Sequence, residues 1–266
     1  MKNNIKLVLL SGIILIAFAS SAQVYNINTF AGNGTGGYTG DGISAVTAEI
    51  NDPEAVSVDT AGDVFITDYE NNRIRMVNTL GIISTVAGNG TAGNTGNGGL
   101  ATLAEINHPY GASVDSSGTL LIADGYNNCV RYVNSSGIIS TVAGNGTAGY
   151  NGDGILATTA ELNSPAAVAF DSIGDYFIAD LSNNRVRMVT KKTGIISTVA
   201  GNGTAGYSGD GGAAVLAELN FISDVATDAK GNIYIDDFNN NCIRKVSTTG
   251  IITTIAGNGT AGYTGD

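Results

Sequence analysis

The chain has 266 residues, with 12 Lys and Arg against 23 Asp and Glu and a formal net charge of −11. A chain this acidic disfavours nucleic acids and anionic lipid surfaces as partners. Glycine is abundant at 38 residues, but a hydrophobic content of 43% argues against disorder and predicts a packed core.

The first 22 residues have the pattern of a secretory signal peptide. Two lysines precede an apolar run over residues 7–19, and small residues occupy the −3 and −1 positions of a cleavage site after Ala22. This run is too short to span a bilayer comfortably, and we expect no membrane span in the mature chain. We therefore predict a bacterial-type signal peptide at 1–22 and an exported mature chain at 23–266, in the periplasm, at the cell surface or secreted.

The remaining chain is built from one repeated unit of 56 or 57 residues. The tetrapeptide Ala-Gly-Asn-Gly marks this period, beginning at Ala31, Ala87, Ala143, Ala200 and Ala256. Within the unit from Asn163, four short runs with period-two apolar patterns are separated by Gly, Asn and Asp turns. This pattern predicts a four-stranded antiparallel meander. An Ala-rich stretch before each meander is expected to form at most a turn or two of helix.

A single meander of this size exposes its edges and cannot bury both faces. Stacking copies around an axis solves both problems, which predicts an all-β chain folded as a β-propeller; the alternative is a linear β-solenoid. Four complete blades are expected, together with an N-terminal strand at 24–32 and a truncated connector at 258–266. The predicted blades are 53–88, 109–144, 165–201 and 222–257.

The segment SPAAVAFDSIGDYFIADLSNNRVRMV, residues 164–189, resembles the NHL repeat. Its marks are an alternating first strand, an Asp-x-x-Gly turn, an Ile-Ala-Asp ending and an Asn-Asn-Arg start to the third strand. The same marks recur at 53–77, 109–133 and 222–246, although Phe221 and Ile222 depart from the usual residue-Pro pair. The insertion GNGTAGYxGDG resembles that of NHL repeats in bacterial exported proteins and in the teneurin NHL domain.

This resemblance implies a six-bladed propeller that binds partners. Because the first strand at 24–32 matches the fourth strand of a blade, and the fourth complete blade already has its own, we expect the sequence to be a fragment of a six-bladed ring. The alternative is a natural four-bladed ring with a redundant strand.

Antiparallel order places alternate connections on opposite faces of a propeller. The loop after each second strand and the long glycine-rich connector share one face, here called the long-loop face. Binding residues tend to lie on long loops over a rigid scaffold, so we expect binding on this face.

No catalytic or cofactor-binding residue is predicted. The glycines of G-x-G-x-x-G at 201–206 do not open a helix within a βαβ unit, so we interpret them as positive-φ turn residues. His108 is the one histidine and is interpreted as a turn residue, which leaves no multi-histidine metal site of the kind used by amidating lyases with NHL-like propellers. Cys129 and Cys242 lie two blades apart, beyond disulfide reach, and are expected to be reduced.

Charged residues that recur in every blade are predicted to be structural. An Asp ends each second strand and an Arg lies early in each third strand, so ion pairs or Asp bonds to loop amides are expected. These residues are Asp68, Asp124, Asp180 and Asp237, with Arg75, Arg131, Arg187 and Arg244.

Two further repeated positions are candidates for binding. The Asp of each Gly-Asp-Gly could bind calcium through its carboxylate; these residues are Asp41, Asp153 and Asp210. The Tyr three residues earlier is expected either to pack the connector against its blade or to stack on sugars; these residues are Tyr38, Tyr150 and Tyr207.

Together these observations favour an exported, non-enzymatic binding module that presents its long-loop face to a protein or glycan. One alternative is a calcium-dependent, lactonase-like propeller hydrolase. Another is a purely structural segment of a larger surface protein.

Overall fold

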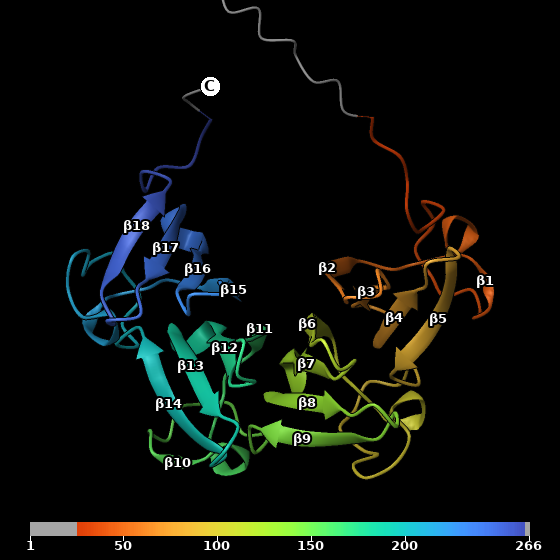
Figure 1. The fold of residues 1–266 in the computed structure, drawn as a ribbon, viewed down its shortest axis with the longest axis horizontal. Coiled ribbons are helices and arrows are strands. Elements are labelled where there is room, and N and C mark those ends of the chain that lie inside the picture. The colour runs from red at the N-terminus through yellow and green to blue at the C-terminus, as the bar shows by residue number, and fades with distance from the viewer. Residues whose placement is uncertain (1–25, 264–266) are drawn as a thin grey trace, which may run out of the picture.

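A computed structural model describes residues 26–263 and shows four antiparallel sheets arranged as an arc around a central hollow (Figure 1). The predicted all-β propeller of four-stranded blades is confirmed. The signal peptide predicted at 1–22 lies outside the described residues. Within 26–263, no helix has the length and apolar character needed to cross a membrane.

Each sheet contains one blade, whose four main strands run in chain order from the hollow outward (Figure 1). Blade 1 contains β2 (Pro53–Val58), β3 (Val64–Asp68), β4 (Arg73–Val77) and β5 (Ile82–Ala87). Blade 2 contains β6 (Pro109–Val114), β7 (Leu120–Asp124), β8 (Cys129–Val133) and β9 (Ile139–Ala143). Blade 3 contains β11 (Pro165–Phe170), β12 (Tyr176–Asp180), β13 (Arg185–Thr190) and β14 (Ile195–Ala200). Blade 4 contains β15 (Ile222–Thr227), β16 (Ile233–Asp237), β17 (Cys242–Val246) and β18 (Ile252–Ala256).

The long connector runs along the outer edge of the blade that follows it. β1 (Ile43–Ser44) pairs with β5, and β10 (Ile155–Leu156) pairs with β14, so both sheets gain a fifth strand. Blades 2 and 4 have single bridges at the same place. The connector thereby covers backbone groups that an edge strand would otherwise expose.

Short 3-10 turns form where the Ala-rich stretches were expected to be helical. Each connector contains one turn, and its first Ala is buried against the blade. These turns are η1 (Ala45–Thr47), η2 (Ala101–Leu103), η4 (Ala157–Thr159) and η6 (Ala214–Leu216). Three more occupy loops after second strands: η3 (Gly125–Asn127), η5 (Leu181–Asn183) and η7 (Phe238–Asn240).

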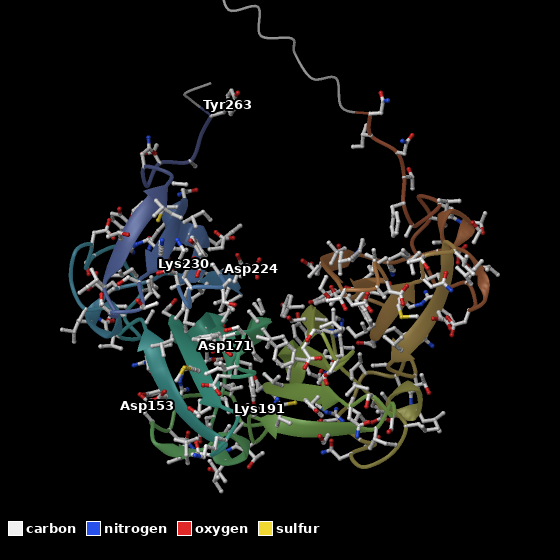
Figure 2. All side chains as sticks on the ribbon, in the orientation of Figure 1. Asp153, Asp171, Lys191, Asp224, Lys230 and Tyr263 are labelled. Atoms are coloured by element: carbon white, nitrogen blue, oxygen red, sulfur yellow. The ribbon has the colours of Figure 1, made fainter. Side chains whose placement is uncertain are left out.

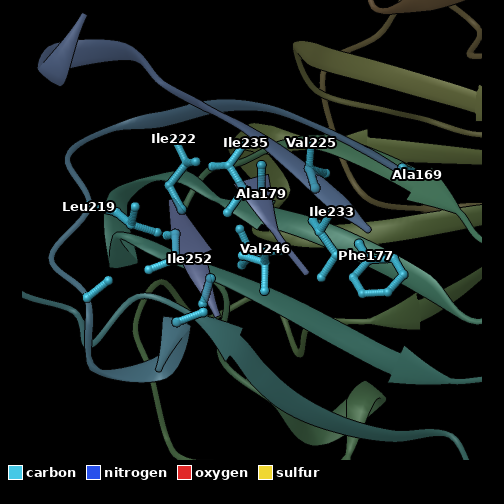
Figure 3. Packing of buried hydrophobic residues seen from close by; sticks show 14 of the residues in the cluster. Ala169, Phe177, Ala179, Leu219, Ile222, Val225, Ile233, Ile235, Val246 and Ile252 are labelled. Carbon is cyan, nitrogen blue, oxygen red and sulfur yellow. The ribbon is translucent and has the colours of Figure 1, made fainter. Parts of the chain in front are cut away.

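The core consists of apolar layers between neighbouring blades. Alternate residues of a strand point to opposite faces, so each blade contributes one set of side chains to each neighbour. Between blades 3 and 4, Phe177 and Ala179 pack with Ile233 and Ile235 (Figure 3). Equivalent layers lie between blades 1 and 2 and between blades 2 and 3.

An asparagine on the long-loop face links each blade to the next. Asn128 ends its loop with φ of 50°, a left-handed conformation that Asn tolerates, and its side-chain oxygen accepts a hydrogen bond from the Ser164 amide at 3.0 Å. Asn72 and Asn184 make the same bond to the following blade. The turn chemistry visible in the sequence therefore also sets the spacing of the blades.

Residues 26–30 differ from the strand expected at 24–32, because they form no strand pairing. Ile27 is 98% exposed and Phe30 is 56% exposed. A strand requires hydrogen bonds from a neighbouring strand, and this segment has none beside it in the arc (Figure 1).

The first glycine of the repeated Ala-Gly-Asn-Gly is required by both conformation and space. We expect Gly144→Ala to destabilise the protein more than Gly146→Ala. Both glycines have positive φ (85° and 90°), which costs an L-residue ~1–2 kcal/mol. A Cβ at Gly144 would also lie 2.3 Å from the Asn128 carbonyl oxygen, whereas at Gly146 the nearest atom is 3.9 Å away.

Urea unfolding of the two variants measures this difference in the free energy of unfolding. Gly144→Ala should lose about 1–3 kcal/mol more than Gly146→Ala, the usual cost of overpacking. Equal losses would show that conformation alone, and not close packing, requires glycine at the first position.

Candidate functional site

A buried Arg–Asp pair lies at the long-loop end of each blade. In blade 3, Arg187 Nη1 lies 3.5 Å from Asp180 Oδ2, and both side chains are fully buried. Asp180 also accepts hydrogen bonds from the Asn163 amide and the Asn183 side chain, each at 2.8 Å. The pair therefore joins the second and third strands to the loop between them.

The same pair recurs in the other three blades. The Nη1–Oδ2 distances are 3.4 Å for Arg75–Asp68, 3.4 Å for Arg131–Asp124 and 3.1 Å for Arg244–Asp237. All eight side chains have no exposed surface.

Each buried arginine also holds the connector that runs along its own blade. Arg187 Nη2 donates to Asp153 at 2.9 Å, and the Thr198 hydroxyl donates to the same carboxylate at 3.1 Å. Asp41 pairs with Arg75, and Asp210 pairs with Arg244. In blade 2, Asn97 replaces the aspartate and still accepts from Arg131 at 3.0 Å.

The calcium candidates Asp41, Asp153 and Asp210 thus each face a guanidinium group. Among the described residues, no group of three or more His, Cys, Asp and Glu side chains is placed to hold a metal ion. Asp153 lies at the outer part of blade 3, far along the blade from the central hollow (Figure 2).

The tyrosines of the connector cover the arginines of the third strand. The Tyr150 ring centroid lies 3.9 Å from Cζ of Arg185 and 4.8 Å from Cζ of Arg187. Tyr38 lies in the same way over Arg73 and Arg75, and Tyr207 lies over Arg244. These contacts are cation–π interactions that hold the connector on its blade, while part of each ring stays exposed.

Burial controls the protonation of the inner aspartates. Desolvation raises the pKa of Asp124 to about 6 and that of Asp180 to about 6, and this effect exceeds the opposing hydrogen bonds and the charge of the paired arginines. The folded protein therefore binds protons at these carboxylates more tightly than the unfolded chain does.

The innermost strands of all four blades surround a cavity of about 650 Å³. Small residues such as Gly111 and Ala167 line much of its wall, which leaves the space unfilled. Three carboxylates line it, those of Glu54, Asp224 and Asp236, and its lining contains no Lys or Arg. Asp224 lies on the inner side of blade 4, beside the hollow (Figure 2).

An aromatic cluster on the long-loop face joins blades 1 and 2 at this cavity. Ring centroids lie 4.7 Å apart for Tyr69 and His108, 5.1 Å for Tyr69 and Tyr110, and 4.5 Å for His108 and Tyr126. Tyr110 lines the cavity, and Tyr126 is 53% exposed. This cluster is the main feature that the sequence analysis missed.

His108 illustrates why it was missed. The residue does occupy a positive-φ turn, at 51°, as interpreted from the sequence. Its ring additionally packs on two tyrosines, and its Nε2 lies 3.8 Å from Glu70. The one signal available was that these positions do not repeat, since residues equivalent to His108 in the other blades are Asp52, Ser164 and Phe221.

A second aromatic pair lies on blade 4, where Phe221 directly precedes β15 and Phe238 begins the loop after β16. Phe221 and Phe238 have ring centroids 6.1 Å apart, and their exposed fractions are 42% and 56%. Both line the cavity. We call Tyr110, Tyr126, Phe221 and Phe238 the aromatic rim.

The two thiols lie away from this rim. Cys129 and Cys242 are free and buried at the starts of their third strands, each 4.0 Å from the inner aspartate of its blade. Burial raises the pKa of both thiols, which disfavours the reactive thiolate.

The buried Arg187–Asp180 pair should contribute more to the free energy of unfolding than the contact of Arg187 with the partly exposed Asp153. We expect Arg187→Met to lower the free energy of unfolding by about 3–5 kcal/mol, because it leaves Asp180 buried without its cation. Asp153→Asn is the control, since Asp153 is 39% exposed and Asn97 serves the same role in blade 2; it should cost at most about 1 kcal/mol. Urea unfolding measures both, and equal losses would contradict the structural role of the buried pair.

The raised pKa values also predict the pH dependence of stability. A folded-state pKa of about 6, above the unfolded value near 3.8, adds stability that is fully present below pH 3.8 and is lost as the pH rises through 6. The urea midpoint should therefore be higher at pH 5 than at pH 7.5. A midpoint that stays constant or increases over this interval would contradict the raised pKa values of Asp124 and Asp180.

Comparison with known proteins agrees with the repeat marks and the blades. The family model of the teneurin NHL domain matches residues 24–93 and 90–151. Teneurin-4 of Mus musculus is 30% identical over 231 residues, covering 77% of this chain, and teneurin-1 of Mus musculus is 27% identical over 235 residues, covering 79%. The matched region is 8% of each teneurin, so the chain spans a small part of these relatives.

Solved structures show the same architecture at lower identity. An auxiliary nutrient binding protein from Bacteroides ovatus has a TM-score of 0.56 at 19% identity, covering 79% of this chain and 50% of that one. A virginiamycin B lyase from Staphylococcus aureus has a TM-score of 0.50 at 18% identity, covering 76% and 54%. These likenesses establish the fold alone. The chain is an NHL-repeat β-propeller protein, similar to the NHL domain of the teneurins.

Proposed function

We propose that this protein is an exported, non-enzymatic binding module whose long-loop face binds a protein or a glycan at the aromatic rim of the central cavity. The observation that carries this proposal is that Tyr126 and Phe221, two exposed aromatic side chains of the rim, do not repeat from blade to blade. Repeated residues build the blades, whereas these two expose large rings at positions where the other blades hold no Phe, Tyr or Trp. Exposed aromatic groups beside a cavity are typical of recognition sites.

The state of the reactive groups supports a non-enzymatic role. The thiols are buried, the inner aspartates are paired with arginines, and His108 is packed between tyrosine rings. None of these arrangements places a base beside an activated nucleophile, which acyl transfer would need. Export is supported by the signal-peptide pattern of residues 1–22.

We also propose that the four blades are part of a six-bladed ring. The face of blade 1 that is turned away from blade 2 is apolar and open, since Val56 is 69% exposed and Val58 is 59% exposed. The matching residues of blade 3, Val168 and Phe170, pack against blade 2. A further blade docked on blade 1 would cover its valines in the same way.

Screening the full chain against an array of glycans and a displayed library of random peptides tests the binding role. Ligands should bind the unmodified protein and lose about tenfold or more in affinity to a Tyr126→Ser plus Phe221→Ser variant. Leu80→Ser plus Ile173→Ser is the matched control, because those side chains are 84% and 74% exposed on turns of the opposite face. Ligands that lose affinity to the Leu80 and Ile173 variant instead would show that binding lies on the face opposite the long loops, which would contradict the proposal.

An enzymatic role has a separate readout. A panel of esters and lactones should show no turnover with or without added calcium. Calcium-dependent hydrolysis that disappears on chelation would overturn the non-enzymatic assignment.

A further inference from the structure

A separate cavity of about 450 Å³ lies between blades 2 and 3, a volume typical of small-molecule sites. Its wall is made by residues of β7, β8 and β9 on one side and of β11, β12 and β13 on the other. It opens where the exposed Ser117, Thr158 and Lys191 line it, and it ends at the buried Leu121 and Tyr176. Blades 2 and 3 each pack against a neighbour on both sides, so this cavity lies inside the arc (Figure 1).

The aromatic side chains at this junction differ from those at the other two junctions. The second residue of the second strand is Phe65 in blade 1 and Phe177 in blade 3, and each ring packs on the next blade. Blade 2 has the smaller Leu121 at this position. The junction is crossed instead by Tyr176 of blade 3, whose hydroxyl donates to the Val142 carbonyl oxygen at 3.2 Å. This hydrogen bond fixes the Tyr176 ring at the wall, and the smaller Leu121 leaves the space beside it open.

Two side chains of opposite charge line the mouth of this cavity, on the face opposite the long loops. Asp115 follows β6 of blade 2, and Lys191 follows β13 of blade 3. Within residues 26–263, no salt bridge joins either side chain to the other or to any further charged group. Both charges are therefore available to a ligand.

The carboxylate of Asp115 is held in place by its own turn. Its Oδ1 accepts hydrogen bonds from the amides of Ser117 and Thr119, each at 2.9 Å, and from the Ser117 hydroxyl at 2.7 Å. Burial raises the pKa of Asp115, but these hydrogen bonds outweigh that effect and lower the pKa below its usual value. The carboxylate is therefore charged at neutral pH.

The cation at the mouth is a departure from the repeat. Lys191 and Lys192 lie in the turn after the third strand of blade 3, which is one residue longer than its counterparts. The corresponding turns at 78–81, 134–137 and 247–250 contain no basic residue. The fold of a blade therefore does not require a lysine here.

The stem of Lys191 lies across the first turn of its own blade. A Cβ at Gly174 would lie 2.9 Å from Cδ of Lys191, so the glycine makes room for the stem, and both residues line the cavity. The neighbouring Asp175 does not line the cavity, and its Oδ1 accepts a hydrogen bond from the Lys191 amide at 2.8 Å. Figure 2 shows Lys191 where blades 2 and 3 adjoin.

We propose that this cavity binds a free α-amino acid with an apolar or aromatic side chain, at a site separate from the aromatic rim. Asp115 pairs with the α-ammonium group and Lys191 pairs with the α-carboxylate. The apolar side chain lies between the blades, against the rings of Tyr132, Phe170 and Tyr176. Apolar walls favour an apolar body, and two unpaired charges of opposite sign favour a zwitterion over a molecule with one charge.

Small molecules test this proposal on the full chain by isothermal titration calorimetry. The probes are L-phenylalanine, L-leucine, glycine, 3-phenylpropanoate, which lacks the ammonium group, and phenethylamine, which lacks the carboxylate. Phenylalanine or leucine should bind, and glycine and both single-charge analogues should bind about tenfold or more weakly. Binding of neither apolar amino acid, or equal binding of an analogue with one charge, would overturn the proposal.

Two lysine variants locate the site. Lys191→Met removes the charge at the mouth and keeps most of the stem, so it should weaken the bound amino acid by about tenfold or more. Lys192→Met makes the same change in net charge on the next residue, which does not line the cavity, and should change affinity less than about twofold. Equal losses in the two variants would show an effect of net charge and would contradict the site.

Filling the cavity gives an independent test. Leu121→Phe introduces the ring that blades 1 and 3 hold at this position, and it should weaken the amino acid by about tenfold or more because the space is occupied. Circular dichroism checks that this variant folds, and the lysine variants decide the question if it does not. A folded Leu121→Phe variant that keeps full affinity would show that the ligand lies elsewhere.

The rim variant separates this site from the binding role of the long-loop face. Tyr126→Ser plus Phe221→Ser should change amino-acid affinity less than about twofold, because neither residue lines this cavity. Loss of amino-acid binding in that variant would place the ligand at the rim and overturn the site between blades 2 and 3, while leaving the binding role of the long-loop face intact.

Discussion

The structure depends on one buried guanidinium group in each blade. Arg187 contacts the inner aspartate of its own blade through one nitrogen and the aspartate of the connector through another. The first contact joins two strands and a loop, and the second fixes a long segment that has almost no strand structure of its own. A planar group with several donors suits this role better than an ammonium group, because it bonds in two directions at once.

This constraint explains how so much glycine is tolerated. The connectors are rich in glycine, yet three of them are held at an Asp and a Tyr, the connector of blade 2 is held at Asn94 and Asn97, and all four are held at the buried Ala of a 3-10 turn. Fixing a chain segment at several points lowers the freedom that glycine would otherwise retain in the folded state. The repeated parts of the molecule are therefore occupied in holding the scaffold together, and recognition falls to residues that break the repeat.

The period and the polar turns were sufficient to predict the strands and their stacking into blades, because period-two patterns and edge protection depend on local residue type. The strand with which each connector pairs was not predictable. Ile43 pairs with Ile83 of the next meander, and no local pattern specifies that partner. The pairing of Asp153 with Arg187 follows from this placement, which is why a calcium ligand and an ion-pair partner looked alike in the sequence.

The aromatic cluster between blades 1 and 2 was unpredictable for a related reason. Tyr69 and Tyr126 come from loops of different blades, and they meet only because the Asn72 link sets one blade against the next. The repeat predicts the role of positions that recur in every blade, and these loop positions differ from blade to blade. Departures from the repeat are therefore informative. Tyr126 occupies a position where the other blades hold Glu70, Ser182 and Asn239, so the packing of a blade does not account for its aromatic ring.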